Sequence, residues 1–444
     1  MEKLFKLREN GTNVKTEIIA GITTFMTMAY ILIVNPNILG DAGMERGAVF
    51  TATAVSAAIA TILMAFLANY PVALASGMGL NAFFAYYVVG VLGYSWEIAL
   101  TAIFIEGIIF VILTLFRFRE AIINSIPANL KYGITVGIGL FITFIGFQNA
   151  KIIVNNDATL VGLGDLKSLT VILSIIGILV TTLMLHKKVK GALLWGILVT
   201  YVLGIICQLT GLYVVDPASG MFSLIPEKII SLPPSVAPIF LKFDFKGALA
   251  LGTNFFVVMF AFLFVDLFDT VGTLIGVASK ANLLDKEGKL PKAKEALMAD
   301  AIGTVAGACL GTSTVTSYVE SAAGVAEGGR TGLTALTTAA LLIVSLIFSP
   351  ILTIIPSFAT APALIIVGLF MVSAISKIDF TEDFTEALPA FLAMIVMPLS
   401  YSIADGIMAG IISWFVLKLI SGNIKKIHPV IYVLVALFIL KIVA

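Results

Sequence analysis

The sequence predicts an all-α polytopic membrane protein with about fourteen transmembrane segments and two short strands. Mean hydropathy is +1.08. Only 12% of the residues are charged, about half the share usual in soluble domains. Apolar runs of about 20 residues, long enough to cross a bilayer, recur along the chain. Because a bilayer core offers no water to backbone polar groups, we expect these runs to be helices.

The chain starts with a polar segment that carries Lys3, Lys6, Arg8 and Lys15, followed by an apolar run over 18–39. This run is too long for the hydrophobic region of a signal peptide, and it has no convincing cleavage site. We therefore expect it to be the first transmembrane helix, retained in the mature protein.

Further spans are expected along the rest of the chain. In order, they cover 47–68, 79–92, 97–116, 129–147, 169–185, 191–211, 248–278, 298–310, 318–326, 332–355, 363–375, 387–401 and 406–420. A last apolar piece, 429–443, is either a further span or a helix lying at the membrane surface.

Basic residues are distributed unevenly between the two faces that these spans define. Most of the 27 Lys and Arg residues fall in alternate loops, with clusters at 187–190 and 280–294 in addition to the N-terminal group. Basic residues favour cytoplasmic loops. We therefore expect a cell-membrane protein with a cytoplasmic N-terminus, with 286–294 inside and 212–245 outside.

The composition argues against several other classes of protein. A formal net charge of +1 is not that of a strongly basic nucleic-acid-binding protein. Cys207 and Cys309 lie in apolar segments outside any CxxC pattern, so no disulfide framework or zinc site is expected. HExxH and Walker motifs are absent, and the only histidines are His186 and His428. We therefore expect neither an enzyme nor a cofactor.

Two of the expected spans, the third and the tenth, are interrupted by small and polar residues. They contain "PVALASGMGLNAFFAY" at 71–86 and "GTSTVTSYVESAAGVAEGGRTG" at 311–332. Each is typical of a short strand, then small residues, then a short helix. Interrupted spans at matching positions of two halves indicate an inverted-repeat transporter with a central site. Irregular backbone at this depth requires surrounding protein or a cavity.

Asp266 and Asp269 lie three residues apart in an apolar span, which places both on one helix face. Because carboxylates in hydrocarbon are costly, both are expected to face a cavity, a partner or water. Thr273, one turn beyond Asp269, extends this polar face. A structural pair, hydrogen-bonded to neighbouring helices, is the alternative.

The interrupted spans supply four more candidates for ligand contact. Glu320 stands at the expected start of a helix, after a run of hydroxyl residues that ends at Ser317. Helix capping is the alternative role of Glu320. Asn81 follows Gly79, whose lack of a side chain permits close backbone approach, and the amide of Asn81 offers both a donor and an acceptor. A structural role at the helix start is the alternative for Asn81.

Other charged residues lie outside this pattern. Glu106 and Asp300 are flanked by apolar residues, but no sequence pattern connects them to the interrupted spans. Asp405 starts an expected helix and is interpreted as a cap. Glu327 and Arg330 are expected to form an ion pair near the cytoplasmic boundary.

Three motifs resemble those of a known family. "SGMGLNAFFAY", "DLFDTVGTLIG" and "GTSTVTSYVESAAGVAEGGRTGLTA" are similar to signatures of the adenine/guanine/hypoxanthine permeases, the AzgA-like branch of the nucleobase/ascorbate transporter (xanthine/uracil permease) superfamily. The similarity extends over nearly the whole chain. It implies an inverted repeat of about seven spans in each half (7+7). It also implies a core domain at 1–126 and 248–358 and a gate domain at 127–247 and 359–444.

The resemblance further implies import of purine bases such as adenine, guanine and hypoxanthine, coupled to protons. Uracil-type relatives carry a His one turn after the acid of the eighth span, where this chain has Thr273. Their proton route therefore cannot be carried over. A homodimer in the lipid bilayer is compatible with the sequence. The residues expected to bind substrate are Glu320, Asp269, Asp266, Asn81, Ser317 and Gly79.

The acids are expected to have different roles. A helix N-terminus favours the ionised form of Glu320, which then anchors the base. Asp266 and Asp269 lack that help, and both desolvation and mutual repulsion disfavour two negative charges on this pair. We therefore expect the aspartate pair to take the coupling proton.

Two other functions are compatible with such a chain. An anion transporter of the same fold is the nearest alternative, but buried carboxylates repel anions. A channel is the other, and passive flux without proton coupling distinguishes it from a symporter.

Overall fold

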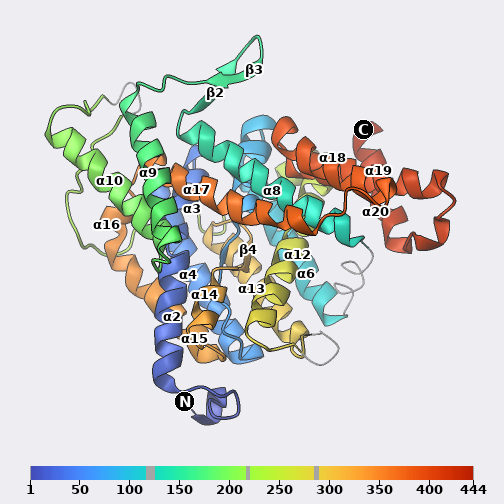
Figure 1. Cartoon of the computed structure of the whole chain (residues 1–444), viewed down its shortest axis with the longest axis horizontal. Coiled ribbons are helices and arrows are strands. Elements are labelled where there is room, and N and C mark those ends of the chain that lie inside the picture. Colours follow the sequence, from blue (N-terminus) through green and yellow to red (C-terminus); the bar gives the residue numbers. More distant parts are fainter. Residues whose placement is uncertain (1, 117–125, 217–220, 285–289, 444) are drawn as a thin grey trace.

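The computed structural model describes residues 2–116, 126–216, 221–284 and 290–443, and the chain is predominantly helical within them (Figure 1). Lys286 and Lys289, which belong to the basic cluster expected on the cytoplasmic side, lie outside the described residues. The α-helices of the first half are α1 (Glu2–Phe5), α2 (Val14–Met28), α3 (Ile31–Asp41), α4 (Arg46–Leu63), α5 (Met78–Ala82), α6 (Trp96–Leu115), α8 (Ala128–Asn149), α9 (Leu169–His186) and α10 (Ala192–Leu209). The π-helices η1 (Met64–Ala68) and η2 (Phe83–Val91) continue α4 and α5.

The second half of the chain is also predominantly helical. Its α-helices are α11 (Phe245–Ala250), α12 (Thr253–Lys280), α13 (Ala293–Leu310), α14 (Ser321–Ala326), α15 (Gly332–Val344), α16 (Ser349–Leu352), α17 (Ser357–Val372), α18 (Phe384–Ser400), α19 (Ile403–Ile420) and α20 (Pro429–Val443). Short 3₁₀ segments are η4 (Ser345–Phe348), η5 (Ser373–Lys377) and η6 (Ile424–Lys426).

Nine helical segments within the described ranges are long and apolar enough to cross a bilayer. The chain is therefore a multi-pass membrane protein. Three shorter apolar helices, Met78–Val91, Thr253–Leu267 and Phe384–Ser400, accompany them. The expected first span is divided into α2 and α3 by the turn at Ala29 and Tyr30.

Strands form at the two interrupted spans, as predicted. β1 (Leu74–Ser76) pairs antiparallel with β4 (Val315–Ser317). Two backbone hydrogen bonds extend this ladder, from Gly77 N–H to the carbonyl of Thr314 and from Tyr318 N–H to the carbonyl of Ala73. The pairing satisfies backbone groups that have no helical partner, which is what permits strands at this depth. A second antiparallel pair, β2 (Ile153–Asn156) and β3 (Leu160–Leu163), forms a hairpin.

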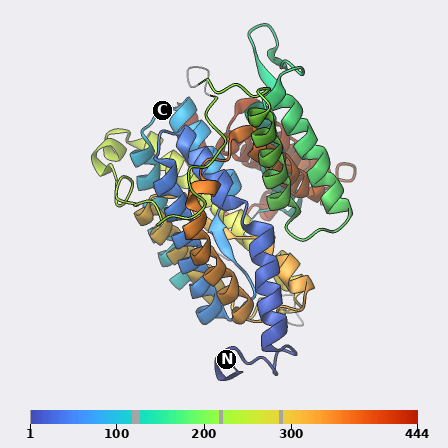
Figure 2. The ribbon, with the colours of Figure 1, turned by 90° about the vertical axis from the view of Figure 1, so that its left-hand side faces the viewer.

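The helices pack in two groups. α2, α3, α4, α6, α12, α13, α14 and α15 pack against one another, and the β1–β4 pair lies among them. α8, α9, α10, α17, α18 and α19 form the second group, with α8, α17 and α18 across the upper part of Figure 1. The β2–β3 hairpin and the N-terminus lie at opposite ends of the molecule in both views (Figures 1 and 2).

Glycines permit close helix approach in the second group. A Cβ added at Gly139 of α8 would lie 2.8 Å from the carbonyl oxygen of Gly368 on α17, and one added at Gly368 would lie 2.5 Å from the carbonyl oxygen of Gly139. Any side chain at either position would force the helices apart. Within a bilayer the hydrophobic effect does not drive helices together, and small residues allow the close van der Waals packing that does.

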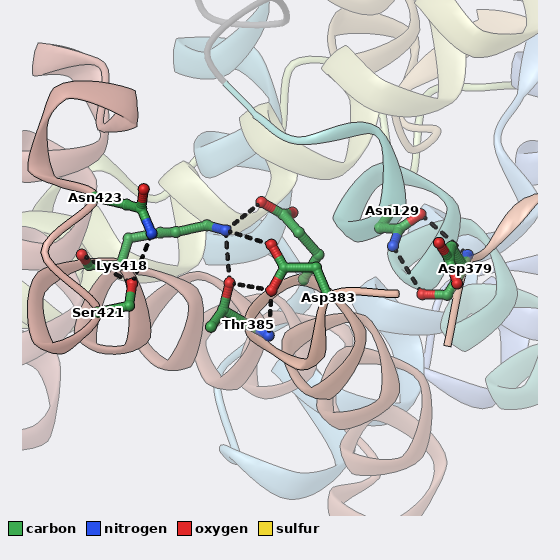
Figure 3. Close-up of polar contacts among 8 residues, drawn as sticks. Asn129, Asp379, Asp383, Thr385, Lys418, Ser421 and Asn423 are labelled. Carbon is green, nitrogen blue, oxygen red and sulfur yellow. Dashed lines mark hydrogen bonds and ion pairs between the residues drawn. The ribbon is translucent and has the colours of Figure 1, made fainter. Parts of the chain in front are cut away.

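Lys418 connects α19 to the start of α18 (Figure 3). Its side chain is fully buried, and its Nζ lies 3.2 Å from Asp383 Oδ2, 2.6 Å from Thr385 Oγ1 and 2.8 Å from Glu386 Oε1. Hydrogen bonds from the Thr385 hydroxyl and backbone N–H, together with the Lys418 ammonium, lower the pKa of Asp383 to about 2. Asp383 is also the N-cap of α18. The same carboxylate therefore caps α18 and pairs with Lys418 of α19.

The start of α8 is fixed beside this cluster. Asn129 Nδ2 donates to the carbonyl of Asp379 over 2.9 Å, and Asn129 Oδ1 accepts from the Asp379 N–H at 3.2 Å (Figure 3). This paired amide contact attaches α8 to the segment that precedes α18.

Two expectations about charged residues are wrong. Glu327 pairs with Lys190 at 2.8 Å instead of with Arg330. Arg330 donates to the carbonyls of Val325 and Gly329, because the negative end of the α14 dipole lies there. Similarly, Asp405 lies in the first turn of α19, and the cap is the Ser402 hydroxyl, which accepts from the Asp405 N–H at 3.2 Å.

Candidate functional site

A cavity of about 300 Å³ lies where β1 and β4 end and α5 and α14 begin. This volume is at the lower end of the range typical of small-molecule sites. Both helix groups contribute to its wall. The first group, with its strands, supplies Tyr30, Gly77, Met78, Gly79, Val265, Asp269, Thr273, Gly276 and the run 316–320. The second group supplies Tyr132, Thr135, Ile138, Val367, Phe370, Met371, Ala374 and Lys377.

The carboxylates of Asp269 and Glu320, two of the three acids that the sequence singled out, face this cavity. Asp269 comes from the middle of α12, and Glu320 directly precedes α14. Thr273 lines the cavity one turn beyond Asp269. Asp269 Oδ2 lies 3.4 Å from the hydroxyl of Thr316 on β4, and the Glu320 carboxylate is close enough to repel Asp269 electrostatically. The cavity is therefore suited to a ligand with hydrogen-bond donors and without negative charge.

Glu320 is held by a residue that the sequence pattern does not single out. The hydroxyl of Tyr30, at the turn between α2 and α3, donates to Glu320 Oε1 over 2.6 Å. The Glu320 side chain makes no capping hydrogen bond to α14, so the capping interpretation is wrong. Tyr30 lies in an apolar run of the sequence, and no pattern there indicates that its hydroxyl contacts a carboxylate. Only the tertiary contact between α2 and α14 reveals it.

Ser317 and Gly79 lie on the cavity wall, where the sequence predicted a ligand-binding role. The Ser317 hydroxyl is buried and has no hydrogen-bond partner within the described residues. A buried polar group of this kind requires a partner, which a ligand can supply. A Cβ at Gly79 would lie 2.8 Å from Ile138 Cγ2, so glycine permits α5 to approach α8. The first turn of α5 also carries backbone N–H groups without intrahelical acceptors, whereas those of Ser321, Ala322 and Ala323 in α14 donate to the carbonyls of Tyr318, Val319 and Glu320.

Asn81 is not among the residues that line the cavity. Its side chain is fully buried, and its Oδ1 accepts hydrogen bonds from the hydroxyls of Ser76, at 2.9 Å, and Ser313. These contacts connect α5 to the segment before β4. In this position Asn81 holds the two interrupted spans together.

Asp266 is also off the cavity wall. Although it lies three residues from Asp269, its Oδ1 faces the hydroxyl of Thr270 at 3.1 Å, and that hydroxyl is 2.8 Å from Asp300 Oδ1. Glu106, on α6, lies 3.3 Å from the Thr314 hydroxyl. Sequence reasoning did not connect Asp300 or Glu106 to the site, because their partners are distant in the chain. Within the described part of the chain, no cluster of His, Cys, Asp and Glu could hold a metal ion.

The second helix group contributes a positive charge to the cavity wall. Lys377 Nζ lies 5.5 Å from the centroid of the Tyr132 ring, and both residues line the cavity. The ammonium and the ring attract one another through the quadrupole of the ring. The cavity thus has carboxylates on one helix group and a lysine on the other.

Comparison with known proteins is consistent with this architecture. The chain is 44% identical over 443 residues to the adenine permease AdeP of Escherichia coli, covering 100% of this chain and 96% of the relative. It is 46% identical over 449 residues to the guanine/hypoxanthine permease PbuG of Bacillus subtilis, covering 99% of each. The transmembrane domain of the cyanobacterial bicarbonate transporter BicA is similar in structure, with a TM-score of 0.65 and 17% identity over 90% of this chain and 97% of that one.

That structural similarity shows the fold. The relatives show that a transporter, not an enzyme, is encoded. Residues 15–420 match the sequence pattern described as the permease family, and the chain belongs to this family.

Proposed function

We propose that this protein is a secondary active transporter that imports purine bases, such as adenine, guanine and hypoxanthine, in symport with protons. The observation that carries the proposal is the presence of Asp269 and Glu320 in one small cavity between the interrupted spans. Carboxylates accept hydrogen bonds from the ring N–H groups of a purine. The Ser317 hydroxyl and the backbone N–H groups at the start of α5 donate to its ring nitrogens or carbonyl. The adenine and guanine/hypoxanthine permeases at 44% and 46% identity support this class of substrate.

The acids have distinct roles in this proposal. Glu320, oriented by Tyr30 over 2.6 Å, anchors the base in its ionised form. The coupling proton is taken at an aspartate of α12, because the aspartates there lie within a continuous helix without free N–H groups beside them. Asn81 supports the wall by holding the two interrupted spans together.

The architecture follows an inverted repeat of about seven spans per half. Residues 1–126 and 248–358 form the core domain, and residues 127–247 and 359–444 form the gate domain. The two packing groups of helices and the antiparallel pairing of β1 with β4 support this division. Movement of one domain against the other exposes the cavity alternately to each side. In this proposal the N-terminus is cytoplasmic. Single cysteines placed at Lys292 and Leu212 test this topology, because they should react with a membrane-impermeant reagent from opposite sides of the membrane.

A neutral base fits the cavity better than an anion does. Asp269 and Glu320 repel one another and would repel a bound anion. Among the described residues that line the wall, Lys377 alone supplies positive charge. This distribution of charge favours nucleobase transport over anion transport on the same fold.

Uptake by the purified protein in proteoliposomes tests the proposal. Radiolabelled hypoxanthine should accumulate under an inward proton gradient, and unlabelled adenine or guanine should compete better than uracil or xanthine. Stronger competition by uracil or xanthine would assign the protein to another substrate class. Equal flux with and without the gradient would indicate a channel.

A further inference from the structure

Asp266, Thr270 and Asp300 form a buried chain beside the cavity. Thr270 lies one turn after Asp266 on α12, and Asp300 lies on α13. The Thr270 Oγ1 atom is 3.1 Å from Asp266 Oδ1 and 2.8 Å from Asp300 Oδ1. All three side chains are fully buried, and none is among the residues that line the cavity. We infer that Asp266 and Asp300 share one proton through Thr270, and that this pair holds the coupling proton of the proposed transport.

A count of hydrogens supports the shared proton. A threonine hydroxyl carries one hydrogen and can donate fully to one acceptor only. If both carboxylates were ionised, this one hydrogen would have to be divided between two negatively charged acceptors, or one of the two contacts would place lone pairs of oxygen against each other. One added proton makes both contacts hydrogen bonds: one carboxyl group donates to Thr270, and Thr270 donates to the other carboxylate.

The proton can reside on either acid. In one arrangement Asp266 carries it and Asp300 is ionised, and in the other the roles are exchanged and the hydroxyl turns round. In both arrangements the pair has a total charge of −1. Release of the proton leaves two carboxylates and breaks one of the two hydrogen bonds. The proton therefore belongs to the pair as a unit.

Neighbouring acids also favour protonation of the pair. Asp269 lies on the same helix, and Asp300 is close enough to repel it. Glu106 stands on α6, which packs against both α12 and α13. Glu320 lies beyond Asp269 at the cavity. Burial of this many carboxylates in one region makes each additional negative charge more costly.

Asp269 links the pair to the cavity. A second negative charge on Asp266 and Asp300 raises the electrostatic cost of an ionised Asp269, so the proton on the pair and the ligand at Asp269 influence one another. This linkage is reciprocal: a bound base changes the affinity for the proton as much as the proton changes the affinity for the base. This coupling role rests on the proposed function, whereas the shared proton does not.

Infrared spectroscopy of the purified full-length protein, without nucleobase, tests the shared proton directly. The carbonyl stretch of a protonated carboxyl group should appear at neutral pH in the difference between wild type and Asp300→Asn, and between wild type and Asp266→Asn. Asp269→Asn should retain this band. The hydroxyl-preserving variant Thr270→Ser should leave its frequency unchanged, and Thr270→Val should displace it. Thr338→Val controls for loss of a buried hydroxyl, because Thr338 bonds backbone carbonyls away from the site.

Two results would overturn the inference. One is a carboxyl region that is identical in wild type and Asp300→Asn. That result would mean that Asp266 and Asp300 do not share a proton. The other is a Thr270→Val spectrum indistinguishable from that of wild type, which would exclude the hydroxyl bridge. If the band behaves as expected but no nucleobase is transported, the proposed substrate fails and the shared proton stands.

The coupling role has a separate test in proteoliposomes. Thr270→Val should lose hypoxanthine accumulation driven by an inward proton gradient, and Thr270→Ser should retain it. Retention of gradient-driven accumulation by Thr270→Val would show that the bridged pair does not hold the coupling proton.

Discussion

Hydroxyl groups accompany the acids at and behind the cavity. Tyr30 donates to Glu320, and Thr316 lies beside Asp269. A hydroxyl beside a carboxylate stabilises the charged form by donating and can accept when the acid is protonated. These contacts give each acid its own environment, although all of them lie in one apolar region.

Replacement of Tyr30 by Phe should weaken base binding. The variant removes the hydroxyl that orients Glu320, and hydrogen bonds to charged groups contribute about 1.5–3 kcal/mol. We therefore expect the dissociation constant for hypoxanthine to rise by about tenfold or more. Tyr201→Phe is the matched control, because the Tyr201 hydroxyl donates to the Leu224 carbonyl over the same distance, 2.6 Å, far from the cavity. Equal affinities of Tyr30→Phe and Tyr201→Phe would exclude the positioning role of Tyr30.

Replacement of Asp269 by Asn should separate binding from its pH dependence. The amide keeps the size of the side chain and its place beside Thr316, but it removes the charge that links the cavity to the buried pair. We expect reduced hypoxanthine binding that no longer varies with pH, because the proton on the pair no longer changes the charge balance at residue 269. A variant that binds with the pH dependence of wild type would show that Asp269 does not transmit the charge.

Contacts between elements far apart in the chain hold the core in place. Glu17 on α2 is fully buried and accepts from the N–H groups of Arg330, Thr331 and Thr334 at 2.8, 3.3 and 3.1 Å, and from the Thr334 hydroxyl at 2.6 Å. These N–H groups precede or begin α15, where intrahelical acceptors are lacking. A carboxylate from the first span therefore caps a helix of the second half.

Glu17→Ala should destabilise the protein by about 3 kcal/mol or more, because it removes a buried acceptor of four donors and leaves the N–H groups of Arg330 and Thr331 without one. Glu17→Gln keeps one acceptor oxygen and the shape of the side chain, so its loss should be smaller. Unfolding of the purified variants in detergent measures both. The capping role would be contradicted if Glu17→Ala were as stable as Glu17→Gln.

The contact between α18 and α19 should weaken only in strong acid. Hydrogen bonds from Thr385, together with Lys418, lower the pKa of Asp383 to about 2, from an ordinary value of about 4. A lowered carboxyl pKa stabilises the fold fully above the ordinary value, and the contribution is lost as the pH falls towards 2.

Asp383→Asn should therefore lower the melting temperature at pH 7, and its difference from wild type should shrink between about pH 4 and pH 2. The difference should be small, because the Asp383 side chain is 46% exposed and solvent screens its charge. Asp165→Asn, in the turn before α9, is the control for loss of an exposed carboxylate. A difference from wild type that persists unchanged at pH 2 would assign the effect to the cap geometry alone.

Periodicity and composition predict the elements better than they predict the site. Apolar runs define the long helices, and the small-residue stretches at 71–86 and 311–332 predict both strands. Asp269, Glu320, Ser317 and Gly79 lie on the cavity wall where the sequence suggested. Asn81 and Asp266 do not, because helix rotation and the hydroxyls near them, set by tertiary packing, turn their side chains away.

For the whole molecule, the position of the cavity between two helix groups is the central feature. Gly79 on α5 contacts Ile138 on α8 across this junction, and the carboxylates and Lys377 come from different groups. Any sliding of one group past the other must therefore change the cavity. The proposed alternating access requires movement of this kind.

Equilibrium binding of radiolabelled hypoxanthine to purified wild type and Glu320→Gln, across a range of pH, tests the central claim most directly. Glu320 is the anchor of the proposed site, and glutamine preserves its size while removing the charge that Tyr30 orients. We expect wild type to bind and Glu320→Gln to lose binding at every pH. Binding to Glu320→Gln with the affinity of wild type would contradict the claim that this cavity holds the base through Glu320.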